Sequence, residues 1–453
     1  MPIRDLFRVR VNSLPVINAL VLPLGLFASL LGNPSSQPFY PSGFDSLALK
    51  PEWRSSWLFG LARDRQIDAS LANYLKKLGD QGLTIEDQGI WIAAQGAVIA
   101  QHGGITPLPA ASLTKLATTL AAVGTWPLDH RFETLVGVTG PLENGVVYGD
   151  LVVKGSGDPL FVWEEGIVLA NYLQSLGIQR VTGNLLVLGP FTMNFEEDPQ
   201  DSLTALKQVM DSTTWPQATW QAYGQLDPGT GKPNLVITGS VRPITSLAPN
   251  STPKWLVRHQ SLPLVGVLKA MNIYSNNIMA QMVTDLVGGT PEVVTKATAL
   301  ATLPPGELRL VNGSGLGMEN RMSPRAVVAL MVALQQQLGQ QNYSISDILP
   351  VVGQDIGTLV DRRLPATTAV KTGSLAEVSA LAGVVPTASQ GPVWFAILNR
   401  GWNITDLRTE QDNLVLAIQD HWGAARVTAD LTPKVRMQEV DFRYGDPRRN
   451  LAL

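Results

Sequence analysis

Two segments near opposite ends of the chain constrain the fold most, because each has the pattern of a β-hairpin. Residues 90–101, IWIAAQGAVIAQ, place apolar runs on both sides of a Gln-Gly pair. Residues 379–387 and 392–400, SALAGVVPT and PVWFAILNR, predict a second hairpin, and an amphipathic helical pattern follows at 409–423. We therefore expect both ends of the chain to share one antiparallel sheet flanked by helices, in an α+β fold.

The middle of the chain has a different character. Residues 135–250 contain β-branched runs punctuated by glycine, such as GVVYGDLVVKG, and two connections rich in Pro and Gly. We interpret this stretch as an inserted, mainly β domain, because 453 residues exceed the roughly 250–300 that one core usually supports. The predicted division is a leader and linker at 1–44, a catalytic domain at 45–134 and 251–430, the insertion, and a C-terminal tail at 431–453.

The amino terminus has the order typical of an export signal. Arg4, Arg8 and Arg10 precede an apolar stretch at 14–32, and a polar segment rich in Pro and Ser follows. The apolar stretch is about long enough to cross a bilayer, so a retained membrane anchor and a cleaved signal both stay open. Either interpretation places the protein outside the cytoplasmic membrane, in the periplasm or cell envelope.

Composition excludes several kinds of chemistry. The chain has no cysteine, which removes disulfides, thiolate nucleophiles and cysteine-bound metals. Lys and Arg total 34 against 37 Asp and Glu without a basic run, so no nucleic-acid partner is expected. We predict neither a metal nor a cofactor, because the four histidines are scattered and never form an H-x-x-x-H pair. They are His102, His130, His259 and His421.

A serine and a lysine lie one helical turn apart in AASLTKLATT, residues 110–119. Positions i and i+3 share a helix face, so Ser112 Oγ and Lys115 Nζ can meet. The start of a helix also offers free N–H groups to a developing oxyanion. To accept a proton, Lys115 needs a pKa lowered from ~10.4 toward neutrality, which burial and a second cation can produce. Ser251 and Lys254 repeat this spacing, but the intervening Pro253 argues for a loop.

Two further motifs follow in order. Ser275-Asn276-Asn277 supplies a hydroxyl and a carboxamide two positions apart, in a region with a helical pattern. Lys371-Thr372-Gly373 lies just before the second hairpin, where an edge strand can offer free N–H groups to a substrate. Together with Ser112 and Lys115, this is the arrangement of penicillin-binding proteins and β-lactamases.

At this point the chain resembles the class C low-molecular-mass penicillin-binding proteins, D-alanyl-D-alanine carboxypeptidases and endopeptidases of the bacterial cell wall. The resemblance covers about residues 60–425 and includes GDLVVKGSGDPLF at 149–161 and VNGSGLGMENRMSPRAV at 311–327. It implies a β-lactamase/transpeptidase-like sheet, with an extra domain inserted between the first and second motifs. The implied substrates are peptidoglycan stem peptides ending in D-Ala-D-Ala, and the implied inhibitors are β-lactams.

The resemblance also implies a role for each motif residue. Ser112 would attack the carbonyl of the penultimate D-alanine, and Lys115 would take its proton. Ser275 would relay a proton to the leaving D-alanine, Lys371 would lower neighbouring pKa values, and Asn277 would orient Lys115.

Substrate binding would fall to the third motif. Thr372 would hydrogen-bond the terminal carboxylate, Gly373 would allow close backbone approach, and Ser374 would share the oxyanion hole with the Ser112 N–H. The family often has threonine at the position of Ser374 and aspartate at that of Asn276. Neither difference touches an expected catalytic side chain. Asn312, where the family usually has aspartate, and Ser314 are expected to be structural residues near the site.

Three alternatives stay open. A β-lactamase uses the same residues, and Glu133, Glu164 or Glu165 could hold its deacylating water. A Ser-His-Asp hydrolase is disfavoured because no G-x-S-x-G elbow occurs. A wall-binding protein that has lost catalysis would keep the fold without being acylated.

Overall fold

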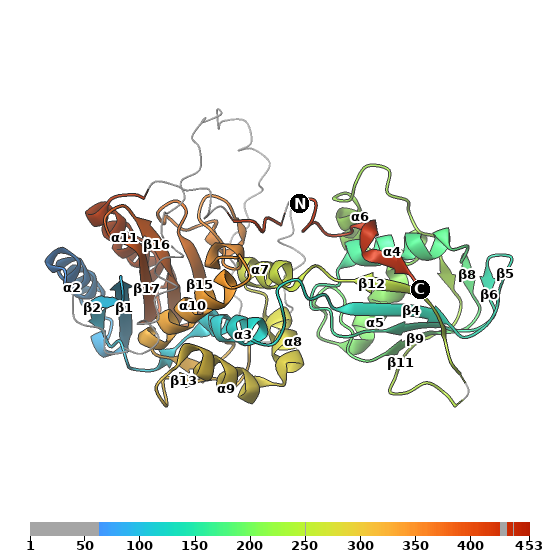
Figure 1. Cartoon of the computed structure of the whole chain (residues 1–453), viewed down its shortest axis with the longest axis horizontal. Helices are drawn as coiled ribbons and strands as arrows, with labels where there is room; N and C mark the ends of the chain where they lie inside the picture. The colour runs from blue at the N-terminus through green and yellow to red at the C-terminus, as the bar shows by residue number, and fades with distance from the viewer. Residues whose placement is uncertain (1–62, 250, 426–432, 438) are drawn as a thin grey trace.

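The structure, a computed structural model, describes residues 63–249, 251–425, 433–437 and 439–453. Its elements form two parts, each built around its own sheet, with helix α7 between them (Figure 1). The expected leader and linker at 1–44 lie outside the described residues, as do parts of the ranges 45–134, 251–430 and 431–453. No helix among the described residues has the length and apolar character needed to span a membrane.

The first part contains a five-stranded antiparallel sheet that confirms both hairpins. Its order, β15-β16-β17-β1-β2, joins strands from the two ends of the chain through the β1–β17 pair, in which Gln88 lies opposite Asn399. The strand β15 therefore lies at an edge, as expected for the third motif. The strands are β1 (Gln88–Ala94), β2 (Ala97–His102), β15 (Ala369–Leu375), β16 (Val378–Thr387) and β17 (Gly391–Arg400).

Helices cover both faces of this sheet because its central strands are apolar on both sides. In β1, Trp91 and Ala93 belong to one core, whereas Ile90 and Ile92 belong to the other. The first core includes α3 (Thr114–Val123), α7 (Leu264–Tyr274), α8 (Asn277–Val287), α9 (Thr290–Ala301) and α10 (Pro324–Gly339). The second includes α2 (Arg65–Asp80) and α11 (Ile404–Trp422). A small sheet of β3 (Leu108–Pro109), β14 (Arg321–Met322) and β13 (Leu308–Arg309) lies beside them.

The second part corrects one expectation, since the stretch 135–250 is not mainly β. It contains three helices, α4 (Trp163–Ser175), α5 (Pro199–Val209) and α6 (Gln217–Tyr223), whose apolar faces share one core with the strands. A four-stranded sheet has the order β10-β8-β6-β5, formed by Val236–Ile237, Arg180–Val181, Val146–Val147 and Leu142–Glu143.

The main sheet of the second part has the order β11-β9-β7-β4-β12-β18. It includes β4 (Glu133–Val138), where the chain enters, and β12 (Lys254–Gln260), where it returns, with Glu133 opposite Gln260. The last strand, β18 (Asn450–Ala452), pairs with β12, so the end of the expected tail joins this sheet. The other strands are β7 (Leu151–Lys154), β9 (Leu185–Leu188) and β11 (Val241–Ile244).

Candidate active site

Ser112 lies in a single 3-10 turn, Ala111–Leu113, that leads directly into α3. Its predecessor Ala111 has φ of 46°, a left-handed conformation that is unfavourable for a residue with a Cβ atom. Such strain persists only where the surroundings enforce it. Here it is enforced beside the predicted nucleophile, whose side chain lines a pocket.

Lys115 is fully buried and holds three contacts. Its Nζ lies 3.0 Å from Ser112 Oγ, 2.8 Å from Asn277 Oδ1 and 2.7 Å from the carbonyl oxygen of Ser314. Burial lowers the pKa of Lys115 well below its ordinary value, and the positive charge of Lys371 lowers it further. A neutral amine has two N–H donors and one lone pair. Two contacts are to oxygens that only accept, so the lone pair of the neutral amine faces the Ser112 hydroxyl.

The Ser314 carbonyl is held in place by the loop VNGSG. Asn312 Oδ1 accepts hydrogen bonds from the N–H groups of Ser314 and Gly315, at 3.2 and 2.8 Å, and from the Ser314 hydroxyl at 3.1 Å. Gly315 has φ of +85°, and a Cβ atom there would lie 1.9 Å from the carbonyl oxygen of Ala111. The loop therefore packs directly against the turn that carries Ser112, as expected of Asn312 and Ser314.

The second motif lies at the break between two helices. Ser275 follows the last residue of α7 with φ of 53°, again left-handed. Asn276 is the N-cap of α8, and its Oδ1 accepts the Met279 N–H at 2.9 Å. Asn277 opens α8 and contacts Lys115. An asparagine at position 276 keeps the capping oxygen, which explains why the expected aspartate is not needed.

The third motif lies on the edge strand β15. Lys371 is fully buried, and its Nζ donates to Ser275 Oγ at 2.9 Å and to the Thr372 carbonyl at 2.8 Å. Burial lowers the pKa of Lys371 to about 7. A Cβ atom on Gly373 would lie 3.0 Å from the Ser112 nitrogen, so the strand passes very close to Ser112. Among the described residues neither Lys115 nor Lys371 forms an ion pair, and the two amines lie in one cationic groove.

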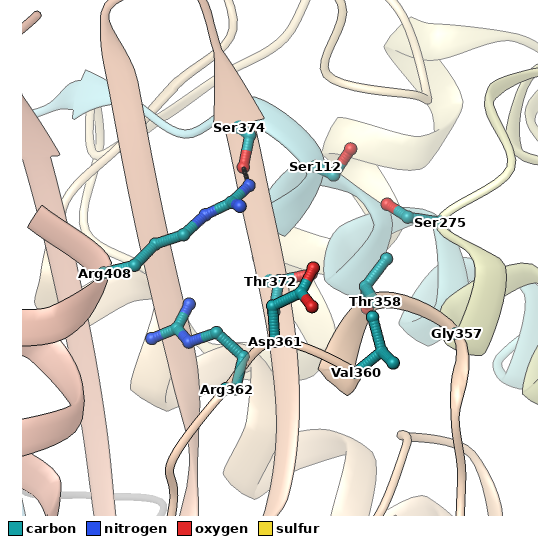
Figure 2. Close-up of a pocket in the computed structure, with 10 residues that line it drawn as sticks. All are labelled: Ser112, Ser275, Gly357, Thr358, Val360, Asp361, Arg362, Thr372, Ser374 and Arg408. Carbon is teal, nitrogen blue, oxygen red and sulfur yellow. Dashed lines mark hydrogen bonds between the residues drawn. The ribbon is translucent and has the colours of Figure 1, made fainter. Parts of the chain in front are cut away.

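A pocket of about 330 Å³ opens at this point. Ser112 and Ser275 reach it from the first and second motifs, and Thr372 and Ser374 line it from β15 (Figure 2). All eight predicted site residues thus lie in or next to one groove. Sequence reasoning missed six other lining residues, Gly357, Thr358, Val360, Asp361, Arg362 and Arg408. No motif marks them, because a loop and a helix bring them to the pocket from elsewhere in the chain.

The residues of the alternative mechanisms lie elsewhere. Glu164 and Glu165 are buried in α4, where Glu165 pairs with Arg449 and its second oxygen lies 3.7 Å from His259 Nε2. Glu133 opens β4 and pairs with Arg258. Ser251 precedes β12 and Lys254 begins it, so the second S-x-x-K lacks helical geometry, as predicted.

None of the three glutamates and none of the four histidines lines the pocket at Ser112. His130 stacks on Trp126, His102 contacts the carbonyl oxygen of Ile85, and His421 contacts Asp64.

Comparison with known proteins identifies the family. A curated relative, carboxypeptidase DacB of Mycolicibacterium smegmatis, is 27% identical over 350 residues, 69% of this chain and 75% of the relative. The penicillin G-acylated Bd3459 predatory endopeptidase of Bdellovibrio bacteriovorus, solved with its immunity protein, has a TM-score of 0.67 at 20% identity, covering 81% and 99% of the two chains. Penicillin-binding protein 4 of Haemophilus influenzae has a TM-score of 0.57 at 18% identity, covering 77% and 99%.

These two structures share the fold, which confirms the α+β, transpeptidase-like architecture. The match to a family description extends over residues 67–191 and 236–420, most of the chain. It includes all three motifs, and its gap lies within the stretch that we interpret as inserted. The motifs, the fold and this match agree: the chain belongs to the D-Ala-D-Ala carboxypeptidase 3 (S13) family.

Proposed function

We propose that this protein is a serine D-alanyl-D-alanine carboxypeptidase that hydrolyses peptidoglycan stem peptides through an acyl-enzyme on Ser112. One observation carries the proposal: the Lys115 amine lies between Ser112 Oγ and Asn277 Oδ1, and Lys371 contacts the neighbouring Ser275. A nucleophile beside an amine that is itself oriented by a third group is the geometry of nucleophilic catalysis.

Acylation uses Lys115 as the base. The neutral amine takes the Ser112 proton as Oγ attacks the carbonyl carbon of the penultimate D-alanine. The N–H groups of Ser112 and Ser374 bind the oxyanion, which Gly373 permits because its backbone passes close to the Ser112 nitrogen.

Collapse of the tetrahedral intermediate breaks the C–N bond. Ser275 passes a proton to the leaving nitrogen, and Lys371 supplies the adjacent positive charge at pH values below its pKa of about 7. Thr372 hydrogen-bonds the terminal carboxylate of the substrate. Water then attacks the ester carbonyl, releases the shortened peptide as a carboxylate and restores the Ser112 hydroxyl.

Penicillin would acylate the same serine, because its strained amide occupies the position of the scissile bond. The Bdellovibrio endopeptidase that shares this fold is acylated by penicillin G, which supports the proposal. The same Bdellovibrio protein is described as a predatory peptidoglycan endopeptidase, which supports a substrate in the cell wall. We therefore place the protein outside the cytoplasmic membrane.

A fluorescent penicillin tests the nucleophile. Wild type and Ser251→Ala should label with one probe per chain, whereas Ser112→Ala should not label at all. The proposal would be contradicted if Ser112→Ala were labelled, or if Ser251→Ala were the only variant that failed to label.

Mass spectrometry of isolated wall fragments then identifies the reaction. Loss of one alanine marks a carboxypeptidase, and conversion of dimers to monomers marks an endopeptidase. Rapid turnover of penicillin without peptide cleavage would instead indicate a β-lactamase, and a binding protein would show neither label nor product.

A further inference from the structure

An arginine outside the three motifs reaches the site. Arg408 lies in the second turn of α11, and its guanidinium donates a hydrogen bond to Ser374 Oγ at 2.8 Å. Figure 2 shows the side chain extending from the helix across the sheet to Ser374 on β15, at the pocket that Ser112 also lines. Its position depends on the packing of α11 against the sheet.

Arg408 is not committed to any carboxylate of the protein. Among the described residues it forms no ion pair, and the bond to Ser374 uses one of its five N–H donors. The neighbouring Arg362 is different, because its guanidinium donates to Asp412 at 2.6 and 2.8 Å and to Gln411 at 3.2 Å. Of the two arginines that line the pocket, Arg408 is therefore the one whose remaining N–H donors can bind a ligand.

The size of the substrate places its carboxylate near Arg408. In D-Ala-D-Ala the terminal carboxylate is one residue beyond the scissile carbonyl, and one residue spans at most about 3.6 Å. A carbonyl held at Ser112 therefore puts the carboxylate beside Thr372 and Ser374, which line the same pocket. Since Ser374 Oγ accepts from Arg408, its own O–H is free to donate toward the carboxylate.

We propose that Arg408 binds the terminal carboxylate of the substrate, together with the Ser374 hydroxyl that it orients, and that it makes the enzyme selective for peptides with a free C-terminus. This inference rests on the proposed function, in which Ser112 attacks the penultimate carbonyl. A planar guanidinium suits a carboxylate because it can donate two parallel hydrogen bonds.

Asp361 has the opposite effect. This exposed carboxylate lines the same pocket, and among the described residues it has no hydrogen bond or ion pair. It repels an incoming carboxylate, and it raises the pKa of Arg408, which burial and Arg362 lower. The balance between Arg408 and Asp361 therefore sets the affinity for an anionic terminus.

The test compares two peptides that differ only at the C-terminus, one ending in D-Ala-D-Ala and one in its amide. Arg408→Gln removes a hydrogen bond between a charged side chain and the substrate carboxylate. It should therefore lower kcat/KM on the free acid about 10- to 100-fold. The amide should lose less than about 3-fold, because it has no charge to bind. Equal losses on both peptides, or no loss on either, would overturn the proposal.

Three further variants sharpen the result. Arg408→Lys keeps the positive charge but loses the two parallel N–H donors of the guanidinium. Its kcat/KM on the free acid should lie between those of wild type and Arg408→Gln. Asp361→Asn should lower KM for the free acid and leave the amide unchanged. Arg400→Gln, on β17 and 46% exposed, should change neither peptide. If Arg408→Gln does not fold, the acid-to-amide ratios of Arg408→Lys and Asp361→Asn decide: ratios equal to that of wild type would contradict the proposal.

The labelling experiment separates this inference from the proposed function. Arg408→Gln should still bind one fluorescent penicillin per chain at Ser112 after long incubation, only more slowly. Normal labelling with an unchanged acid-to-amide ratio would refute the role of Arg408 alone. Labelling that persists in Ser112→Ala would refute the proposed function itself.

Discussion

Lys115 and Lys371 belong to one groove but contact different serines. Lys115 Nζ lies 3.0 Å from Ser112 Oγ, and Lys371 Nζ lies 2.9 Å from Ser275 Oγ. Both amines are fully buried, and the charge on Lys371 lowers the pKa of Lys115. We therefore predict that the two lysines act as a coupled pair, in which the charge on Lys371 prepares Lys115 to accept a proton.

The pH dependence of acylation should report this coupling. In wild type the rate should rise as Lys115 loses its proton, at a pH well below the ordinary lysine value. Lys371→Gln removes one of the two causes of the lowered pKa, so the rising limb should move to higher pH as the maximal rate falls. The measurement is the rate of labelling by a fluorescent penicillin between pH 5 and about 10. If the rising part of the pH–rate profile stays at the same pH in Lys371→Gln, Lys371 does not lower the pKa of Lys115.

Asp158 should make stability fall as pH rises. Burial raises its pKa from 3.8 to about 7, and the hydrogen bond that Oδ1 accepts from the Leu160 N–H only partly opposes this shift. Among the described residues, Asp158 Oδ2 has no hydrogen-bond partner. Between these two values the folded protein holds a proton that the unfolded chain releases, so the stabilisation is complete below pH about 4 and is lost as pH rises through about 7.

Asp158→Asn keeps the acceptor and removes the titration. Relative to wild type, its free energy of unfolding should increase by up to about 1.4 kcal/mol per pH unit across that window. Urea unfolding at pH 5 and pH 8 measures the difference. The exposed Asp420→Asn should stay within about 0.5 kcal/mol of wild type at both, and a pH-independent gain in Asp158→Asn would be incompatible with this account.

Gly315→Ala should slow acylation, whereas alanine at a left-handed glycine far from the site should not. The left-handed φ alone costs about 1–2 kcal/mol, and the added Cβ atom would meet the Ala111 carbonyl at 1.9 Å. Moving this loop displaces the Ser314 carbonyl from Lys115, so acylation should fall at least about tenfold. Gly177→Ala is the matched control, because Gly177 has φ of +91° with nothing within 4 Å. It should lose similar backbone energy and label normally.

The buried ion pair between Lys269 and Asp355 should stabilise the segment that follows Asp355 and lines the pocket. Lys269 Nζ lies 2.7 Å from Asp355 Oδ2, with side chains 0% and 8% exposed, and Asp355 directly precedes the loop 356–361. Lys269→Met leaves Asp355 buried without its cation, and should cost about 3–5 kcal/mol of unfolding free energy and slow acylation.

Two comparisons check the origin of that loss. Lys76→Met breaks an exposed pair, whose side chains are 71% and 63% exposed, and should cost less than about 0.5 kcal/mol. Adding Asp355→Asn to Lys269→Met should recover stability, because it removes the unpaired charge. A double variant no more stable than the single one would rule out that cause.

The sequence predicted those parts of the site that follow from local spacing. Ser112 and Lys115 are one helical turn apart, and Lys371 precedes a recognisable hairpin, so their settings could be deduced without coordinates. The hairpins were equally visible, because their strands are apolar runs bounded by turn residues. The left-handed conformations of Ala111 and Ser275 carried no signal, since neither residue type favours them.

Other features depend on tertiary packing and could not be deduced. Arg408 reaches Ser374 only because α11 packs across the sheet, and nothing in its local pattern distinguishes it from a solvated helical arginine. The helices α4–α6 were missed for a related reason: the β-branched runs around them dominated the pattern of 135–250, and their own apolar faces have meaning only against that sheet.

The pairing of Glu133 with Gln260 means that the chain enters the second part and returns from it at adjacent positions of one β-ladder, whereas the C-terminal segment reaches the same sheet separately through β18. A change of length between these two positions therefore leaves the spacing of the two chain crossings unchanged, so the helix that follows Ser112 need not move to accommodate it.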